Sequence, residues 1–99
     1  MKLRDYRFTP LAERDLENIQ DSLADQYPER DIRFIAKLEK TIEQLRIFPE
    51  MGQQIERLEG YRTVIIWDFV IFYCVLDNVI AIERVLHGAR DIKAVFSEE

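Results

Sequence analysis

The sequence predicts an α+β fold with a short N-terminal strand, an antiparallel helix hairpin and a three-stranded antiparallel meander. Residues 60–91 hold three apolar runs rich in β-branched and aromatic side chains, which suit a pleated, packed surface. The segment before them has apolar residues at helical spacing, bounded by proline and glycine. With 99 residues, 47% of them hydrophobic and 33% charged, the chain is expected to form one globular domain over residues 1–99.

The first elements are a short strand and two helices. Tyr6 and Phe8 alternate with charged residues, which indicates the strand. Thr9 and Pro10 are typical of a helix start, since Thr caps the first turn and Pro lacks an N–H that would have no partner there. Pro28 ends this helix, and a second is expected over residues 29–48. The apolar stripes are Ala12, Leu16, Ile19, Leu23 and Tyr27 in the first helix, and Ile35, Leu38, Ile42 and Leu45 in the second.

The strands of the meander are expected at residues 64–67, 69–76 and 79–86. Asp77 and Asn78 form a short polar break between the last two, which is typical of a tight hairpin. Successive side chains of a strand point to opposite faces, and both sets are apolar in this meander. Such strands are found in sheets that are covered on both faces.

Two helices can cover only one face of this sheet. The other face would expose an apolar patch of roughly a few hundred Å2, which is typical of a protein-binding surface. The alternative is that residues 89–96 fold back over part of that face. We favour the first interpretation because so much apolar surface is left uncovered.

Composition excludes several classes of protein. The net charge of −5, from 14 basic and 19 acidic residues, argues against direct nucleic-acid binding driven by phosphate contacts. No apolar run is long enough for a membrane span, and the N-terminus lacks the apolar segment of a signal peptide. One cysteine, Cys74, cannot form an internal disulfide, which favours a reducing cytoplasm. No glycine-rich phosphate loop and no cluster of metal ligands is present, so neither cofactor nor metal is expected.

Any catalysis would depend on Arg62, Arg84, His87 and Arg90. Arginines near a histidine at the end of a sheet could hold a phosphate while the histidine transfers a proton. The alternative is that Arg84 and Arg90 pair with Glu83, Asp91 or Glu59 and that His87 bonds to backbone at a strand end. Structural ion pairs are commoner than active sites, so we favour the alternative.

Five short motifs follow one another along nearly the whole chain. They are A-x-x-D-L-x-x-I (Ala12, Asp15, Leu16, Ile19), L-x-x-x-P-x-x-G (Leu45, Pro49, Gly52), G-Y-R (residues 60–62), V-I-F-Y-x-V (residues 70–75) and R-V-L-H-G-x-R-D (residues 84–91). In this order and spacing they resemble the RelE/ParE superfamily of bacterial toxins. I-F-Y and R-V-L-H-G-A-R-D resemble the ParE branch most.

The resemblance implies a small α+β toxin of a type II toxin–antitoxin system. Its partner would be a cognate ParD-like antitoxin, whose C-terminal segment wraps the apolar groove and sheet and neutralises the toxin in a hetero-oligomer. ParE-type members inhibit DNA gyrase, whereas RelE-type members cut mRNA on the ribosome. Both activities belong to the bacterial cytoplasm and to plasmid or chromosome stabilisation.

Departures from the RelE pattern favour the ParE branch. Arg62 matches the arginine that RelE-like nucleases have in the G-Y-R position. Their basic residues after the second helix are reduced here to Arg57, and their C-terminal tyrosine is replaced by Phe96, which has no hydroxyl for acid–base chemistry. We therefore expect a non-enzymatic, gyrase-inhibiting toxin. The alternatives are an mRNA interferase that uses Arg62, His87 and Arg90, and an inert member that only binds its antitoxin.

Residues expected to contact the antitoxin or the target combine large aromatic side chains with cations near the last strand. Tryptophan, tyrosine and arginine are the types that most often anchor protein interfaces. The predicted contact residues are Trp67, Tyr73, Arg84, His87, Arg90 and Phe96.

Overall fold

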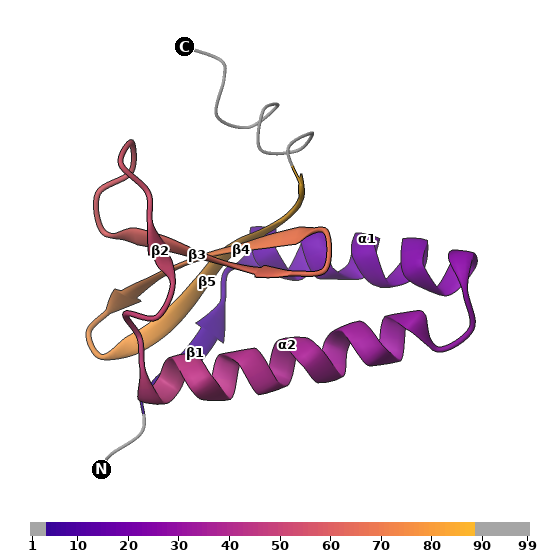
Figure 1. Ribbon diagram of the computed structural model, residues 1–99, viewed down its shortest axis with the longest axis horizontal. Coiled ribbons are helices and arrows are strands. Elements are labelled where there is room, and N and C mark those ends of the chain that lie inside the picture. The colour runs from indigo at the N-terminus through magenta and orange to yellow at the C-terminus, as the bar shows by residue number, and fades with distance from the viewer. Residues whose placement is uncertain (1–3, 89–99) are drawn as a thin grey trace.

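The computed structural model describes residues 4–88, which form two helices and one sheet (Figure 1). The elements are β1 (Asp5–Phe8), α1 (Pro10–Gln26), α2 (Arg30–Ile47), β2 (Gln53–Gln54), β3 (Tyr61–Ile66), β4 (Phe69–Leu76) and β5 (Val79–His87). The predicted strand, helix hairpin and β3–β4–β5 meander are confirmed. Neither described helix is long and apolar enough to cross a membrane.

The sheet differs from the prediction in its edges. Its order is β1-β5-β4-β3-β2, and β1 runs parallel to β5, so the sheet is mixed and has five strands. The pattern of side chains in a short strand does not show which neighbouring strand its backbone pairs with. In the structure β1 pairs with β5. β2 was not predicted because Gln53 and Gln54 are both exposed and polar, which leaves no apolar alternation to detect.

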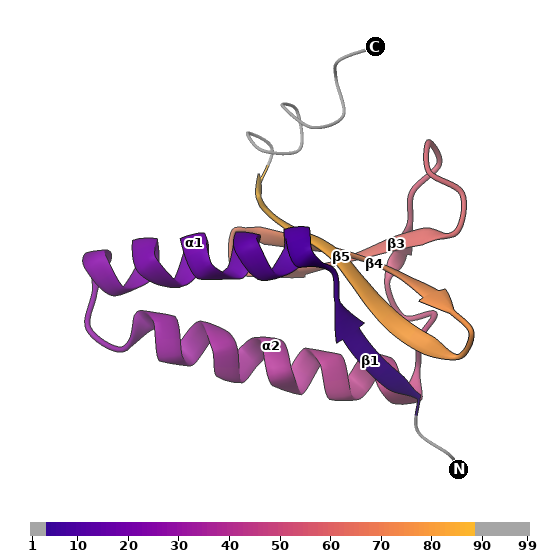
Figure 2. The same cartoon turned by 180° about the vertical axis from the view of Figure 1, so that it is seen from behind.

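The two helices pack side by side on one face of the sheet, and Figure 2 shows them from behind with β1 in front. The Thr9 hydroxyl accepts the N–H of Ala12 at 3.1 Å, which confirms the predicted cap. α2 buries Phe34 fully, whereas Ile35, which we expected in the core, is only partly buried. Tyr27 was expected on the apolar stripe of α1, but it follows the end of the helix and is 64% exposed.

Two tight turns join the strands of the meander. Asp77 and Asn78 both have positive φ, 50° and 65°, which is typical of the two-residue turn that best matches strand twist. The predicted hairpin is therefore confirmed. The β3–β4 turn consists of Trp67 and Asp68, and Trp67 has a φ of 56°, an unusual conformation for a bulky side chain.

A β-bulge in β5 determines which side chains face the helices. Phe72 lies opposite Arg84 and Tyr73 opposite Ile82, so Glu83 is the extra residue. The bulge lets Ile82 and Val85 both face the helices, although three positions separate them. The strand residues of the core are Ile66, Phe69, Ile71, Tyr73, Ile80, Ile82 and Val85, which pack against Ala12, Ile19, Leu23, Phe34, Leu38, Ile42 and Leu45 of the helices.

The outer face of the sheet, which points away from the helices, exposes less apolar surface than predicted. Phe72, Cys74, Ala81 and Leu86 are buried there. Cys74 lies next to Tyr61 of β3 and Glu83 of β5, which cover part of it. The expectation of one continuous apolar patch is therefore wrong, and exposed apolar side chains such as Ile65 and Leu76 lie apart. The alternative involving residues 89–96 falls outside the described residues.

Candidate functional site

Tyr73 and Arg62 hold the loop after α2 against the sheet. The Tyr73 hydroxyl donates to the carbonyl of Pro49 at 2.7 Å and accepts the N–H of Gly52 at 3.0 Å. The Arg62 guanidinium donates to the carbonyls of Gly52 at 2.8 Å and Glu50 at 3.1 Å. Burial raises the pKa of Tyr73, while the Gly52 N–H and the charge of Arg62 oppose that shift. We call this arrangement the loop clasp.

Gly52 is required in the loop clasp because of space. A Cβ at this position would lie 2.5 Å from the Tyr73 hydroxyl oxygen and 2.8 Å from the Thr63 carbonyl oxygen. Tyr73 has no exposed surface at all, so its predicted role as a binding anchor does not agree with the structure. The motif residues Pro49, Gly52, Arg62 and Tyr73 thus meet in one place, where they stabilise the fold.

The start of α1 closes the edge of β5 beyond β1. The Thr9 N–H donates to the Ile82 carbonyl at 3.1 Å, and the Thr9 hydroxyl donates to the Glu83 carbonyl at 2.9 Å. One turn further along the helix, the Asp15 carboxylate accepts the N–H of Val85 at 3.0 Å. Side chains of α1 therefore take the place of a neighbouring strand over this part of β5.

Arg84 belongs to the same edge. Its guanidinium contacts the two carboxylate oxygens of Asp15 at 2.8 and 3.1 Å, and the side chains are only 27% and 14% exposed. Two parallel bonds of this kind fix the geometry of both groups. Arg84 therefore forms an ion pair, as that interpretation predicted, but with Asp15, which was not among the expected partners.

His87 lies at the end of β5, with its ring 5.1 Å from that of Phe69 in an edge-to-face contact. His87 on β5 lies opposite Phe69 of β4, and Arg62 on β3 lies opposite Tyr73 of β4. Four residues of strand span about 13 Å, and β4 itself lies between the two residues. The structure therefore does not bring Arg62 and His87 together. Arg90 and Phe96 lie outside the described residues.

Trp67 is a predicted contact residue that lies at the surface, with 38% of its area exposed. The Arg30 guanidinium lies 4.6 Å from its ring centre and 5.8 Å from that of Tyr27, and the Phe34 ring is 5.6 Å away. The cluster joins the α1–α2 turn to the β3–β4 turn. Sequence reasoning missed Arg30 and Tyr27, because a contact between distant segments leaves no local signal.

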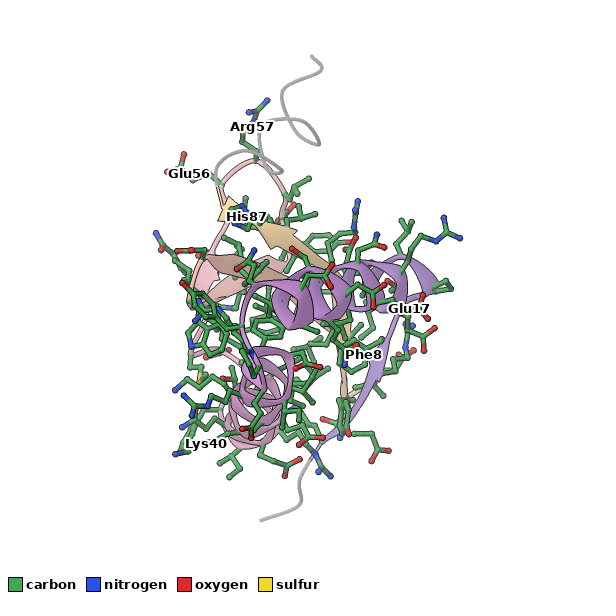
Figure 3. The ribbon with its side chains drawn as sticks, turned by 90° about the vertical axis from the view of Figure 1, so that its right-hand side faces the viewer. Phe8, Glu17, Lys40, Glu56, Arg57 and His87 are labelled. Carbon is green, nitrogen blue, oxygen red and sulfur yellow. The ribbon has the colours of Figure 1, made fainter. Side chains whose placement is uncertain are left out.

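Four cations follow one side of α2. Arg30, Arg33, Lys37 and Lys40 have spacings of three, four and three, which place them on one side of a helix. Neither of the two ion pairs between described residues involves them. Figure 3 shows Lys40 on the same side of the molecule as Glu56 of the β2–β3 loop, with Glu17 of α1 on the opposite side. We call these four residues the α2 basic flank. Their spacing in the sequence is the signal that could have identified this flank.

Cys74, Glu83 and Tyr61 form a polar group on the outer face. The Cys74 thiol lies 3.7 Å from a Glu83 carboxylate oxygen. Burial, together with the Glu83 carboxylate, raises the pKa of Cys74, and the Glu83 charge and burial raise that of Tyr61. Both groups are therefore neutral at pH 7, and a neutral thiol is a poor nucleophile. Within residues 4–88 we find no cluster of His, Cys, Asp and Glu that could hold a metal ion.

Comparison with solved structures identifies the fold. The chain is similar to the chromosomal ParDE TA system from P. aeruginosa, with a TM-score of 0.73, 20% identity and coverage of 87% of this chain and 97% of that one. It is similar to the RelBE2 toxin–antitoxin complex from Mycobacterium tuberculosis, with a TM-score of 0.61, 24% identity and coverage of 87% and 99%. For the E. coli DinJ-YafQ toxin–antitoxin complex the values are 0.59, 16%, 96% and 98%.

The sequence was compared with curated proteins and with protein-family models. No curated protein matches the chain. The family model described as the ParE toxin of the type II toxin-antitoxin system parDE matches residues 6–92. That range includes the loop clasp, the edge closed by Asp15 and all seven elements except the first residue of β1. The chain therefore belongs to the ParE toxin family of type II toxin–antitoxin systems.

Proposed function

We propose that this toxin inhibits DNA gyrase in the bacterial cytoplasm and is neutralised by a cognate ParD-like antitoxin in a hetero-oligomer. The match to the ParE toxin family over residues 6–92 carries the proposal. The similar solved structures include the ParDE system and the RelBE2 and DinJ-YafQ toxin–antitoxin complexes, which supports an antitoxin partner.

The separation of Arg62 from His87 supports a mechanism without RNA cleavage. General acid–base catalysis needs its groups within hydrogen-bond reach of one reacting centre. Arg62 is bonded to two loop carbonyls, and His87 lies about 13 Å further along the strand direction. The hydroxyl of Tyr73, which lies opposite Arg62 on β4, is buried and bonded within the loop clasp.

The alternative is a ribosome-dependent mRNA interferase. Arg62 in the G-Y-R motif and the shared fold of the RelBE2 and DinJ-YafQ complexes favour it. In that case Arg62, His87 and Arg90 would supply charge and proton transfer. A member that only binds its antitoxin is the third candidate.

Two assays on the same toxin preparation test the proposal. Full-length toxin, refolded after separation from its antitoxin, should block supercoiling of relaxed plasmid by gyrase or trap cleaved DNA, and added antitoxin should restore supercoiling. The same toxin should leave mRNA intact in a translating extract. His87→Gln is the matched variant, and we expect it to inhibit gyrase as the wild type does. Ribosome-dependent cleavage that His87→Gln abolishes, with gyrase unaffected, would establish the interferase instead.

A further inference from the structure

The α2 basic flank carries positive charge that the described part of the chain leaves without a carboxylate partner. The side chains of Arg33, Lys37 and Lys40 are exposed to solvent. Arg30, at the start of the helix, is partly buried. Neither ion pair within residues 4–88 includes any of the four. A row of cations along one side of a helix is the electrostatic signature of a surface that binds a polyanion.

The carboxylates of the two helices lie on a different side of the molecule. Four of them line the cavities between the helices, namely Glu17 and Asp21 of α1 and Asp31 and Glu39 of α2. Figure 3 shows Glu17 and Lys40 on opposite sides. The net charge of −5, which argued against phosphate contacts, is therefore unevenly distributed. A polyanion can approach the flank while the acidic side is turned away from it.

The flank has the length that several phosphate contacts need. It covers ten helical steps from Arg30 to Lys40, or about 15 Å of helix. The same length of duplex DNA carries about nine phosphate charges, counted over both strands. The four cations can therefore meet phosphates at the same time, without any change in the helix.

One end of the flank is already held in position. The guanidinium of Arg30 lies 4.6 Å from the ring centre of Trp67 and 5.8 Å from that of Tyr27. Stacking uses the flat face of a guanidinium and leaves the N–H groups at its edge for a phosphate. Because the stack fixes this side chain before a ligand arrives, binding costs less conformational entropy there.

The packing of α2 determines which part of a duplex it can contact. Its opposite side buries Phe34, Leu38 and Leu45 in the core, so the helix cannot enter the major groove as a free recognition helix does. The flank can therefore reach phosphates but not base edges, and phosphate contacts carry no sequence information. A duplex also holds its phosphates in fixed positions, whereas an acidic peptide must first be ordered.

We propose that the α2 basic flank binds the phosphate backbone of the duplex DNA on which gyrase acts, without preference for sequence. This inference rests on the proposed function, because gyrase supplies the DNA. Contacts of this kind are weak alone, with dissociation constants of about 10⁻⁴–10⁻⁶ M at physiological salt. The flank therefore adds to the contact between toxin and enzyme, and it orients the toxin on DNA that the enzyme already holds.

The salt dependence of binding counts the contacts. The probe is a short fluorescein-labelled DNA duplex, titrated with full-length toxin at several salt concentrations and followed by fluorescence anisotropy. Four phosphate contacts should give a slope of about −3.6 for the logarithm of the binding constant against that of the salt concentration. Affinity should then fall about a hundredfold from about 50 to about 200 mM salt. A slope near zero, or a strong preference between two unrelated duplexes, would overturn the proposal.

Paired variants with equal net charge identify the surface. Arg33→Gln combined with Lys37→Gln leaves two cations on the flank, and the slope should fall to about −1.8. Arg7→Gln combined with Arg14→Gln is the matched control, because it removes two cations at exposed positions of β1 and α1. The control should keep the wild-type slope, and circular dichroism should be unchanged for both variants. Equal slopes for the two variants would show that net charge alone determines the affinity.

Other polyanions are tested by competition. A duplex RNA of the same length and a polyglutamate peptide of equal charge are each added to the complex of toxin and labelled DNA. Neither should displace the labelled DNA better than unlabelled DNA does. If either binds about tenfold more tightly than DNA and loses that affinity in the flank variant, the flank recognises RNA or an acidic protein, and the assignment to DNA is wrong.

The supercoiling assay separates this inference from the proposed function. The flank variant should need about tenfold more toxin than the wild type for half-maximal inhibition of gyrase, and the control variant should need the same amount as the wild type. If the flank variant inhibits as well as the wild type, the inference is wrong while the proposed function stands. If the wild type leaves gyrase unaffected, the proposed function fails, and the titrations alone decide whether the flank binds DNA.

Discussion

At the scale of single residues, the Tyr73 hydroxyl shows how one polar atom fixes a loop. It bonds to the Gly52 N–H and the Pro49 carbonyl, and Tyr73 itself has no exposed surface. Tyr73→Phe leaves the Gly52 N–H buried without that partner, which should cost about 1–3 kcal/mol. For a chain of this size each kcal/mol corresponds to about 4–8 °C in Tm. Thermal and urea unfolding followed by circular dichroism measure the loss.

Tyr61→Phe is the control for that prediction. Tyr61 is the other tyrosine on the three central strands, and it lies partly exposed on the outer face. We expect its change to stay within about 0.5 kcal/mol. Equal stability of Tyr73→Phe and Tyr61→Phe would show that the loop clasp contributes nothing measurable.

The free energy of unfolding should depend on pH in the alkaline range because of Cys74. Burial first, and Glu83 second, raise its folded-state pKa above the ordinary 9.0. The folded protein then holds this proton more tightly than the unfolded chain does. The stabilisation is therefore complete below about pH 9 and is lost as the pH rises through the folded pKa. Cys74→Ala should flatten the decline in unfolding free energy above about pH 9, as urea titrations at several pH values would measure. Parallel curves for the two proteins would contradict this assignment.

At the scale of elements, the edge of β5 depends on Asp15. Asp15→Ala removes the acceptor for the Val85 N–H and the partner of Arg84, and it should cost about 1.5–3 kcal/mol. Asp15→Asn keeps an oxygen for Val85 and loses the charge, so its loss should be smaller. Asp21→Ala, at an exposed position of the same helix, is the control. Urea unfolding gives the order, and an Asp15→Asn variant as unstable as Asp15→Ala would assign the effect to charge alone.

Elements with local causes could be predicted from sequence. Thr9 and Pro10 start α1, and Asp77 and Asn78 turn the last hairpin, because these residues determine backbone geometry at their own positions. Features with distant causes could not. The partner of Arg84 lies 69 positions away in the chain and the Tyr73 hydroxyl bonds 24 positions away, so no window of sequence contains both groups.

The candidate site, too, could be predicted only where its features have local causes in the sequence. Several residues of the family motifs form the loop clasp or close the β5 edge, where they stabilise the fold. For the same reason they said little about binding, and Tyr73 proved to be structural. The α2 basic flank was visible in the sequence as a spacing, but the stacking of Arg30 on Trp67, which brings the flank next to the β3–β4 turn, was not.

At the scale of the whole molecule, the sheet joins the two ends of the described chain. β1 pairs with β5, whereas β4 and β5 are joined by a two-residue turn. Closing the long loop costs entropy before its contacts form, so the hairpin should form before β1 docks. Phe8, which lies on β1 and packs against the core, reports on docking, and Ile71 on β4 reports on the hairpin. Phe8→Ala and Ile71→Ala should each lower the free energy of unfolding by more than about 0.6 kcal/mol, the minimum for a reliable kinetic comparison.

The two variants should then differ in which rate they change. Phe8→Ala should speed unfolding and leave the folding rate nearly as in the wild type, because its contacts form after the transition state. Ile71→Ala should slow folding, because its contacts are already present there. Stopped-flow measurements over a range of urea concentrations give both rates for each variant. If Phe8→Ala slows folding in proportion to its whole loss of stability, β1 pairs with β5 in the transition state, and the ends of the chain meet before the sheet is complete.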